Sequence, residues 1–411
     1  MSSKAPLRTP GYRFAVLGAF MLVVAANQLL WITFAAITRD AAAFYGVSDL
    51  AIGLLSLVFL LVFLVASLPA SWTLDTVGIR VGVGIGAVLT GGFGLVRGLV
   101  ATDYTWVLVS QIGIAIGQPF VLNAISKVAG RWFPQRERAT AAGLGSLAIY
   151  AGILTGLALT PTLVRVMDLP TALLAYGAFA AVAAVVFFVI VRERPAQPVG
   201  PEERALVLDG LRSVLREPNF RILLLLFFIG LGLFNAVTTW IEDVVRPRGF
   251  SPDQAGLAGG MMVVGGIVGA VLVPMLSDRS GRRVPFLVLA LVGATPGLLG
   301  VAFAESMSLL LISSFALGAF LLSSGPLGFQ YAAEVTFPAP EGTSNGLLLL
   351  AGQVSGIAFI VAMDALKTPT GSMTPSLVVL AVLLAFSAAL ATRLREPGRS
   401  RPLPPGGDAQ G

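Results

Sequence analysis

The chain has 411 residues, of which 56% are hydrophobic and only 12% are charged, and its net charge is +6. A soluble domain has about 25% charged residues, so the composition excludes a soluble globular protein and indicates a polytopic membrane protein. The lack of Cys and His excludes disulfides and thiol catalysis, and it removes the commonest metal ligand and proton shuttle. We therefore expect no metal, no cofactor and no enzymatic activity. We assign the positive charge to membrane-facing loops rather than to a nucleic-acid surface.

Twelve apolar segments, each long enough to cross a bilayer as a helix, follow one another along the chain. They lie near 13–37, 50–72, 79–101, 104–128, 139–163, 171–192, 219–245, 254–277, 284–304, 307–332, 343–364 and 373–393. A polar segment rich in proline and charge separates the first six from the last six, and its part 202–216 is a candidate surface helix. We predict an all-α membrane protein of two six-helix bundles. Its parts would be an N-terminal bundle (1–192), a cytoplasmic linker (193–218), a C-terminal bundle (219–395) and a disordered tail (396–411).

A short polar motif occurs once in each half at the same spacing. The motifs are LDTVGIR, from Leu74, and LSDRSGRR, from Leu276, and their Asp, Gly and Arg residues lie 203 positions apart. The Phe-Pro pairs at 133–134 and 337–338 repeat with an offset of 204. Parallel repeats in a membrane chain predict two helical bundles related by an axis along the membrane normal.

The glycine of each motif permits a tight turn, and its charged residues can cap helix ends and pair with each other. We interpret the two motifs as a latch that gates the cytoplasmic face; the alternative is an ordinary charged turn that fixes topology. The predicted gating residues are Asp75, Gly78, Arg80, Asp278, Gly281, Arg283 and Glu334.

The distribution of Lys and Arg predicts the orientation. Of the 27 basic residues, 21 lie on the side of the two termini and 6 on the other side. Because basic residues collect in cytoplasmic loops, we place both termini in the cytoplasm and the protein in the plasma membrane. The six residues assigned to the outer side are Arg39, Arg97, Arg165, Arg246, Arg248 and Lys367.

Polar side chains inside the predicted spans are candidates for a central site, because they are costly to expose to lipid. Asn27 and Trp31 share one face of the first span, with Gln28 beside them. An indole face attracts a cation, and an amide can bind the polar end of the same ligand; the alternative for Trp31 is an interfacial anchor. Further candidates lie in the fourth, fifth, seventh and eleventh spans: Gln111, Gln118, Asn123, Tyr150, Phe234, Asn235 and Gln353.

Each of these residues alone fits a helix–helix hydrogen bond, but their spread over five spans predicts a central cavity. Glu242 and Asp243, near the outer end of the seventh span, are expected to be solvated or to lie at a rim.

The repeated turn motif resembles the loop signature of the major facilitator superfamily. The stretch GPLGFQYAAEVTFPAPEGTSNGLL (325–348) is similar to the corresponding stretch of the feline leukaemia virus subgroup C receptor-related transporters, and so are FYGVSDLAIGLLS (44–56) and RWFPQRERATA (131–141). The resemblance extends from about Asn27 to about Lys367. The superfamily's intramembrane arginine of the fourth helix is replaced, with Gln111 near that place, and the Gly-Pro antiporter signature is absent from 145–156, which argues against proton antiport.

The resemblance implies the major facilitator fold and transport of choline or ethanolamine; haem and pyridoxine are also associated with the family. By position, Trp31 resembles the tryptophan that faces the quaternary ammonium, and Gln353 resembles the glutamine that contacts the polar end of the ligand. Asn235 and Tyr150 stand where the family has tyrosine and glutamine, so either an aromatic and an amide have changed places or the substrate differs.

We therefore predict a monomeric secondary transporter that moves a small organic cation across the lipid bilayer by alternating access. The alternatives are a multisubstrate exporter of amphipathic molecules, a haem transporter and a membrane receptor that binds without transport. Without histidine, the axial ligands of haem would have to be Tyr or Met.

Overall fold

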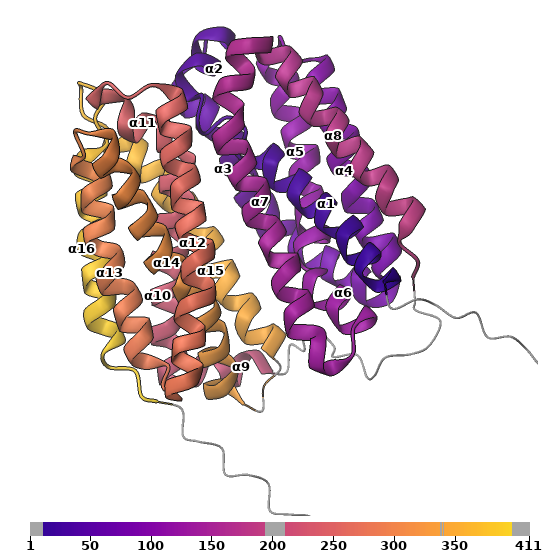
Figure 1. Ribbon diagram of the computed structural model, residues 1–411, viewed down its shortest axis with the longest axis vertical. Coiled ribbons are helices and arrows are strands. Elements are labelled where there is room, and N and C mark those ends of the chain that lie inside the picture. Colours follow the sequence, from indigo (N-terminus) through magenta and orange to yellow (C-terminus); the bar gives the residue numbers. More distant parts are fainter. Residues whose placement is uncertain (1–10, 194–209, 338, 340, 397–411) are drawn as a thin grey trace, which may run out of the picture.

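The computed structural model describes residues 11–193, 210–337, 339 and 341–396. Twelve helices in this part are long and apolar enough to cross a membrane, and they form two bundles (Figure 1). The first bundle contains α1 (Tyr12–Ile32), α3 (Asp49–Thr76), α4 (Ile79–Leu99), α5 (Tyr104–Leu122), α7 (Gln135–Met167) and α8 (Leu169–Ile190). The second contains α10 (Pro218–Thr239), α12 (Pro252–Ser280), α13 (Val284–Phe303), α14 (Met307–Thr336), α15 (Glu341–Ala365) and α16 (Thr374–Ala391). The predicted fold class is confirmed.

Shorter helices lie at the two ends of the bundles. The helices α2 (Thr38–Tyr45) and α11 (Ile241–Val245), followed by η2 (Arg246–Arg248), lie at one end, which we call the α2/α11 end (Figure 1). The helices α6 (Ile125–Trp132) and α9 (Leu211–Arg216) lie at the opposite, α6/α9 end. The candidate surface helix 202–216 is described only from residue 210, where α9 forms its last part; most of the predicted linker and nearly all of the predicted tail lie outside the described residues.

Close packing inside each bundle depends on small residues, which let helix backbones approach in a membrane protein. A Cβ atom added to Gly177 of α8 would lie 2.3 Å from the carbonyl oxygen of Gly94 on α4. A Cβ atom added to Gly318 of α14 would lie 1.7 Å from the carbonyl oxygen of Met262 on α12. Any larger side chain at either position would therefore push two helices apart.

The turns confirm the internal repeat. Six described residues have a positive φ, and each lies 203 positions from another of the six. Because L-residues other than glycine rarely adopt a positive φ, the coincidence means that turns occur at the same places in both bundles, although Gly78 (ψ 175°) and Gly281 (ψ 22°) differ in conformation. The pairs are Gly46 and Gly249 (φ 65° and 85°), Gly78 and Gly281 (108° and 65°), and Asp168 and Gly371 (77° and 82°).

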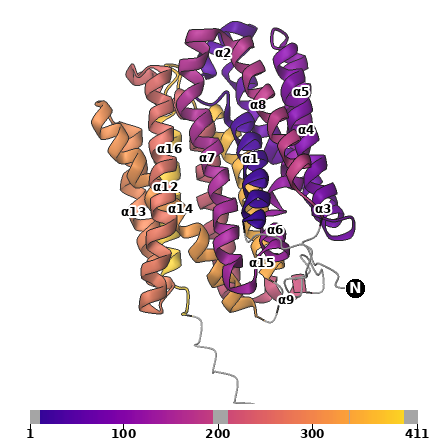
Figure 2. The same cartoon turned by 45° about the vertical axis from the view of Figure 1, so that its right-hand side comes forward.

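The two bundles contact each other in the half of the molecule nearest the α2/α11 end. There α7 packs beside α12 (Figure 2), and a Cβ atom on Gly256 would lie 2.2 Å from the carbonyl oxygen of Leu157. On the other side of the interface, a Cβ atom on Gly53 of α3 would lie 2.5 Å from the ring of Trp240. The bundles are therefore closed against each other at this end.

Candidate functional site

Trp31 is joined to α3 by two hydrogen bonds. Its indole Nε1 donates to the carbonyl oxygen of Ser56 at 3.1 Å, and Ser56 Oγ donates to the carbonyl oxygen of Trp31 at 3.4 Å. The tryptophan is 5% exposed, so it lies inside the protein and not at a lipid interface as an aromatic anchor. Because its N–H is already engaged, a ligand can meet this side chain only through the faces of the ring.

Asn27 joins helices of the first bundle, and Gln28 bonds to it. Asn27 Nδ2 donates to Thr90 Oγ1 at 3.0 Å and to the carbonyl oxygen of Ile114 at 3.4 Å, and Asn27 Oδ1 accepts a hydrogen bond from Gln28 Nε2 at 3.4 Å. The bonds of Asn27 connect α1 with α4 and α5, so in this conformation Asn27 makes helix–helix hydrogen bonds, while Gln28 bonds to Asn27 within α1. Their contact with a ligand stays a prediction.

Asn235 and Gln353 lie in the second bundle beside α3. Asn235 Nδ2 donates to the carbonyl oxygen of Gly352, the residue before Gln353, at 3.5 Å. A Cβ atom added to Gly356, one turn further along α15, would lie 2.5 Å from the side chain of Leu60 and 2.9 Å from Asn235 Nδ2. Leu60 follows Ser56 by one turn of α3, so Trp31 and Asn235 lie near the same part of that helix, and the place of the Gln353 side chain in this group stays a prediction.

Three other predicted site residues are not joined to this group by any hydrogen bond among the described residues. Gln118 of α5 and Phe234 of α10 are buried, and Tyr150 of α7 is half-buried. Gly152, two residues after Tyr150, packs against the carbonyl oxygen of Ala25 and the side chain of Gln28. Their place in a site stays a prediction.

A glutamate from the end of each bundle holds each repeated turn motif. Glu193 accepts hydrogen bonds from the backbone N–H groups of Ile79 at 3.0 Å and Arg80 at 2.7 Å. Glu396 accepts hydrogen bonds from Arg283 N at 3.0 Å and Val284 N at 3.0 Å. The two glutamates also lie 203 positions apart. Each carboxylate therefore caps the positive N-terminus of a spanning helix, a role that the sequence analysis missed and that the repeat offset could have indicated.

The charged side chains of the motifs pair within their own bundles. Asp75 pairs with Lys127, and Arg80 donates to the carbonyl oxygen of Phe188 at 3.3 Å. Arg283 pairs with Asp278 and, at 3.3 Å, with Glu334. These contacts stabilise each bundle in the present conformation. The gating role of the motifs at the α6/α9 end stays a prediction.

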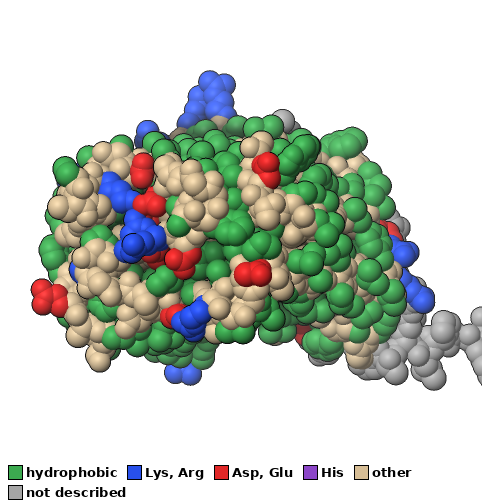
Figure 3. Space-filling model, turned by 90° about the horizontal axis from the view of Figure 1, so that it is seen from above, with side chains coloured by type: hydrophobic (Ala, Val, Ile, Leu, Met, Phe, Trp, Pro, Cys, Tyr) green, Lys and Arg blue, Asp and Glu red, His purple; other side chains and the backbone are tan. Residues whose placement is uncertain are grey.

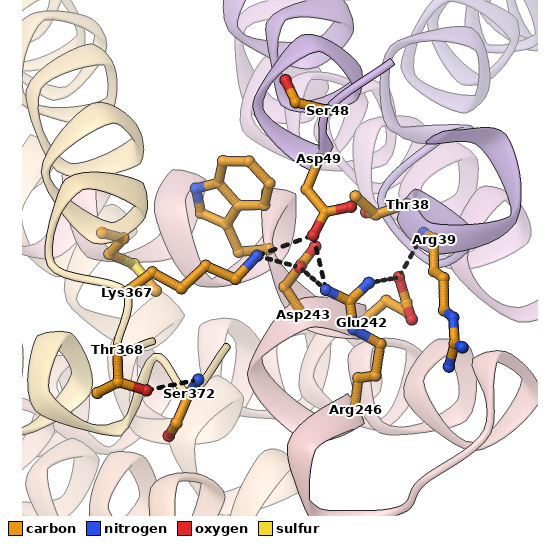
Figure 4. A network of polar contacts seen from close by, with 12 residues as sticks. Thr38, Arg39, Ser48, Asp49, Glu242, Asp243, Arg246, Lys367, Thr368 and Ser372 are labelled. Carbon is orange, nitrogen blue, oxygen red and sulfur yellow. Dashed lines mark hydrogen bonds and ion pairs between the residues drawn. The ribbon is translucent and has the colours of Figure 1, made fainter. Parts of the chain in front are cut away.

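A network of charged side chains joins the two bundles at the α2/α11 end (Figure 4). Asp49, at the start of α3, lies between two cations of the second bundle: its Oδ2 is 2.7 Å from Arg246 Nη2 and 2.9 Å from Lys367 Nζ. The same two nitrogens approach Asp243 Oδ1 at 2.7 Å and 2.8 Å. We call Asp49, Asp243, Arg246 and Lys367 the charged gate. Figure 3 shows acidic and basic side chains side by side on this face of the molecule.

Glu242 forms a second link across the bundles. Its Oε2 accepts the backbone N–H of Arg39 at 2.8 Å, and the carboxylate lies 3.6 Å from Arg246. Burial raises the pKa of Glu242 to about 7, although the hydrogen bond from Arg39 opposes the rise.

The expectation that Glu242 and Asp243 are solvated or at a rim is wrong, because they are only 1% and 0% exposed. They turn inward because α11 packs between the bundles. The repeat contained the signal, since Arg39-Asp40 lies 203 positions before Glu242-Asp243 and the two copies meet across the interface. Among residues 11–193, 210–337 and 341–396, no group of three or more carboxylates is arranged to hold a metal ion.

Arg97 is fully buried, although the sequence analysis assigned it to the outer loops. Its Nη1 donates to the carbonyl oxygen of Leu30 at 2.9 Å and to Gln111 Oε1 at 3.0 Å, and its guanidinium lies 5.7 Å from the centre of the Phe34 ring. The superfamily's intramembrane arginine was expected to be replaced, with Gln111 near its place. A buried arginine does lie beside Gln111, but α4 supplies it instead of α5. A charge four residues from the end of the apolar run 79–101 looks like a loop residue, and only the neighbouring helices reveal its burial.

Comparison with known proteins gives one family. The sequence pattern of the Major Facilitator Superfamily matches residues 16–359 and 242–410. The chain is 32% identical over 381 residues to Solute carrier family 49 member A3 of Danio rerio, covering 88% of this chain and 80% of that protein. It is 30% identical over 380 residues to Choline/ethanolamine transporter FLVCR1 of Felis catus, covering 87% and 68%.

A solved structure has a similar fold. It is the bacterial homolog of the human lysosomal transporter Spinster in an inward-facing and unoccupied conformation. The TM-score is 0.73 at 17% sequence identity, covering 93% of this chain and 97% of that one.

Proposed function

Because this chain belongs to the Major Facilitator Superfamily, we propose that it is a secondary transporter whose substrate is a small organic cation of the choline and ethanolamine class. Similarity to choline/ethanolamine transporters over most of the chain supports this substrate class. Trp31 is the observation on which the proposal depends. Its N–H is tied to Ser56, its ring is buried, and the face of an indole is the best side-chain partner for a quaternary ammonium.

The mechanism that we propose is alternating access, in which the bundles rock around the region of Trp31, Asn235 and Gln353. The contacts at the α2/α11 end would then be those of a state closed on that side. To open there, the protein would have to separate Asp49 from Arg246 and Lys367 and withdraw Glu242 from Arg39. The repeated motifs at the α6/α9 end would latch the opposite state.

We propose that the α2/α11 end faces outward in the plasma membrane. With Arg97 moved from the loops to the interior, 21 basic residues remain on the side of the termini and 5 on the other. The asymmetry supports cytoplasmic termini more strongly than the original count, since buried charge does not contribute to loop orientation.

Uptake of radiolabelled choline into proteoliposomes tests the proposal. Trp31→Ala should abolish uptake, and Trp31→Phe should weaken it, because phenylalanine keeps an aromatic face of smaller cation affinity. Trp106→Phe is the matched control, since that tryptophan is 57% exposed on the outside of α5. Unchanged uptake in Trp31→Ala would contradict the cation site. A thermal shift with bulky amphiphiles but none with choline or ethanolamine would favour the multisubstrate exporter.

A further inference from the structure

Four hydrogen bonds hold two consecutive residues of α1 beside two consecutive residues of α3; two of them are direct, and Gln111 of α5 donates the other two. Trp31 and Ser56 bond to each other in both directions. Gln111 Nε2 donates to the carbonyl oxygens of the preceding residues, Leu30 at 3.2 Å and Leu55 at 3.0 Å. The backbone on both sides of the Trp31–Ser56 contact is therefore fixed by one side-chain amide from α5.

Arg97 determines which way this amide points. The guanidinium can only donate, so its bond to Gln111 Oε1 directs the NH₂ group of Gln111 toward Leu30 and Leu55. Arg97 also donates to Leu30 itself. Both side chains are fully buried, so neither has water as an alternative partner.

The cost of burying Arg97 suggests that it has a role. Desolvating a guanidinium costs several kcal/mol unless a carboxylate pairs with it, and among the described residues none pairs with Arg97. Its Nε and Nη2 atoms have no hydrogen-bond partner there. The second bundle has no arginine–glutamine pair at the equivalent positions, because Gly300 and Ser314 lie 203 residues after Arg97 and Gln111.

We propose that Arg97, acting through Gln111, is the positioning residue for the Trp31 ring and thereby sets the preference for quaternary over primary ammonium. The preference rests on the proposed function; the positioning does not. A quaternary ammonium has no N–H and depends on the ring face, whereas a primary ammonium also donates hydrogen bonds. A displaced ring therefore weakens choline binding more than ethanolamine binding.

The positioning is tested without substrate by 19F NMR of protein labelled with 5-fluorotryptophan. The chain has five tryptophans, and the Trp31 resonance is identified by its loss in Trp31→Phe. Arg97→Lys keeps the charge but loses the planar fork, and Gln111→Met keeps the volume but loses both carbonyl contacts. Each should shift or broaden the Trp31 resonance and leave the others in place.

Arg248→Lys is the matched control, because Arg248 also donates to two backbone carbonyls, of Ala304 at 2.9 Å and Val244 at 3.1 Å, but in the second bundle. It should leave the Trp31 resonance unchanged. If a variant does not purify as a folded protein, Gln111→Glu replaces it, since glutamate keeps the acceptor for Arg97 and removes the two donors. An unmoved Trp31 resonance in a folded Gln111 variant would overturn the proposal.

Transport then tests the selectivity. In Gln111→Met, the KM for choline should rise about tenfold relative to the KM for ethanolamine, whereas a merely structural role would lower the maximal rates of both alike. Equal changes for the two amines would overturn the selectivity claim. If the wild type transports neither amine, the proposed function fails, and the NMR result still decides whether Arg97 positions Trp31.

Discussion

The turns at the ends of the two bundles lie at matching positions of the repeat, whereas the polar side chains between them do not match. Glu193 and Glu396 cap corresponding helices, although the N–H groups bound by Glu396 lie one residue further along the repeat than those bound by Glu193, and the residues of positive φ form three pairs at matching positions. Near Trp31, two buried polar pairs of the first bundle have only small residues as counterparts at the same offset of 203. The pairs are Asn27–Thr90 and Arg97–Gln111, and their counterparts are Gly230, Gly293, Gly300 and Ser314.

This difference separates two kinds of constraint. Features present in both bundles hold each bundle together. The two polar pairs present in the first bundle only are not needed for the architecture that both bundles share. They lie near Trp31, and they are where we expect substrate recognition to be encoded.

Asp49→Asn should have the largest effect, because Asp49 is the member of the charged gate that belongs to the first bundle. The variant keeps the shape but removes two ion pairs between bundles, while Asp243 still neutralises part of the charge of Arg246 and Lys367. A loss of about 2 kcal/mol for the closed state would raise opening about thirtyfold. Because the chain has no cysteine, Leu60→Cys provides one reporter thiol whose labelling rate measures opening at the α2/α11 end.

Asp253→Asn is the control for this variant. It also removes a pair between bundles, with Arg165, but that arginine side chain is 63% exposed. Exposed pairs contribute about 0–1 kcal/mol, so labelling should rise less than about fivefold. Equal labelling rates in the two variants would show that burial of the charged gate has no energetic consequence.

The shared caps should contribute similar stabilities. Glu193→Ala and Glu396→Ala each remove a carboxylate from two backbone N–H groups at a helix N-terminus, which costs about 1–2 kcal/mol. Glu193 also pairs with Arg131, so its loss should be the greater of the two. Thermal unfolding midpoints in detergent measure both. A fall in only one of them would mean that the two bundles do not share this support.

Acid should favour the closed state through Glu242. Burial raises the pKa of this carboxyl to about 7 in the closed state, and exposure to water on opening would return it toward its ordinary value of 4.5. The closed form therefore binds the proton more tightly. Between those two values, each unit of acidification should favour closure by up to about tenfold, and above pH 7 the effect should end.

Labelling of Leu60→Cys across this pH range measures the effect, with rates divided by those of the exposed Thr370→Cys on the same face. Glu242→Gln imitates the protonated form, so its labelling should be slow and independent of pH. A pH dependence that persists in Glu242→Gln would assign the linkage to another group.

The sequence predicted the parts of this molecule that are local or repeated. The twelve spans follow from apolar runs, and the two bundles follow from the offset between Asp75 and Asp278. The burial of Arg97 could not be predicted in this way, because it depends on acceptors at Leu30 and Gln111 that other helices supply. Glu242 was misplaced for a similar reason, since its environment is made by the opposite bundle.

The smallest predicted effect concerns a turn in which the bundles differ by one residue. Asp168 has a φ of 77°, where the second bundle has Gly371 at 82°. Glycine in the first bundle would relieve strain of about 1 kcal/mol but lose the bond from Thr171 N to Asp168 Oδ1, at 2.8 Å. Replacing a capping Asp by glycine costs only a few tenths of a kcal/mol.

Asp168→Gly should therefore change the free energy of unfolding by less than about 1 kcal/mol, whereas Gly371→Ala should lower it by about 1 kcal/mol through strain. Thermal unfolding of the two variants side by side measures the difference. If Asp168→Gly is as destabilising as Glu193→Ala, the Asp168 carboxylate contributes more than a cap, and the turn is not equivalent in the two bundles.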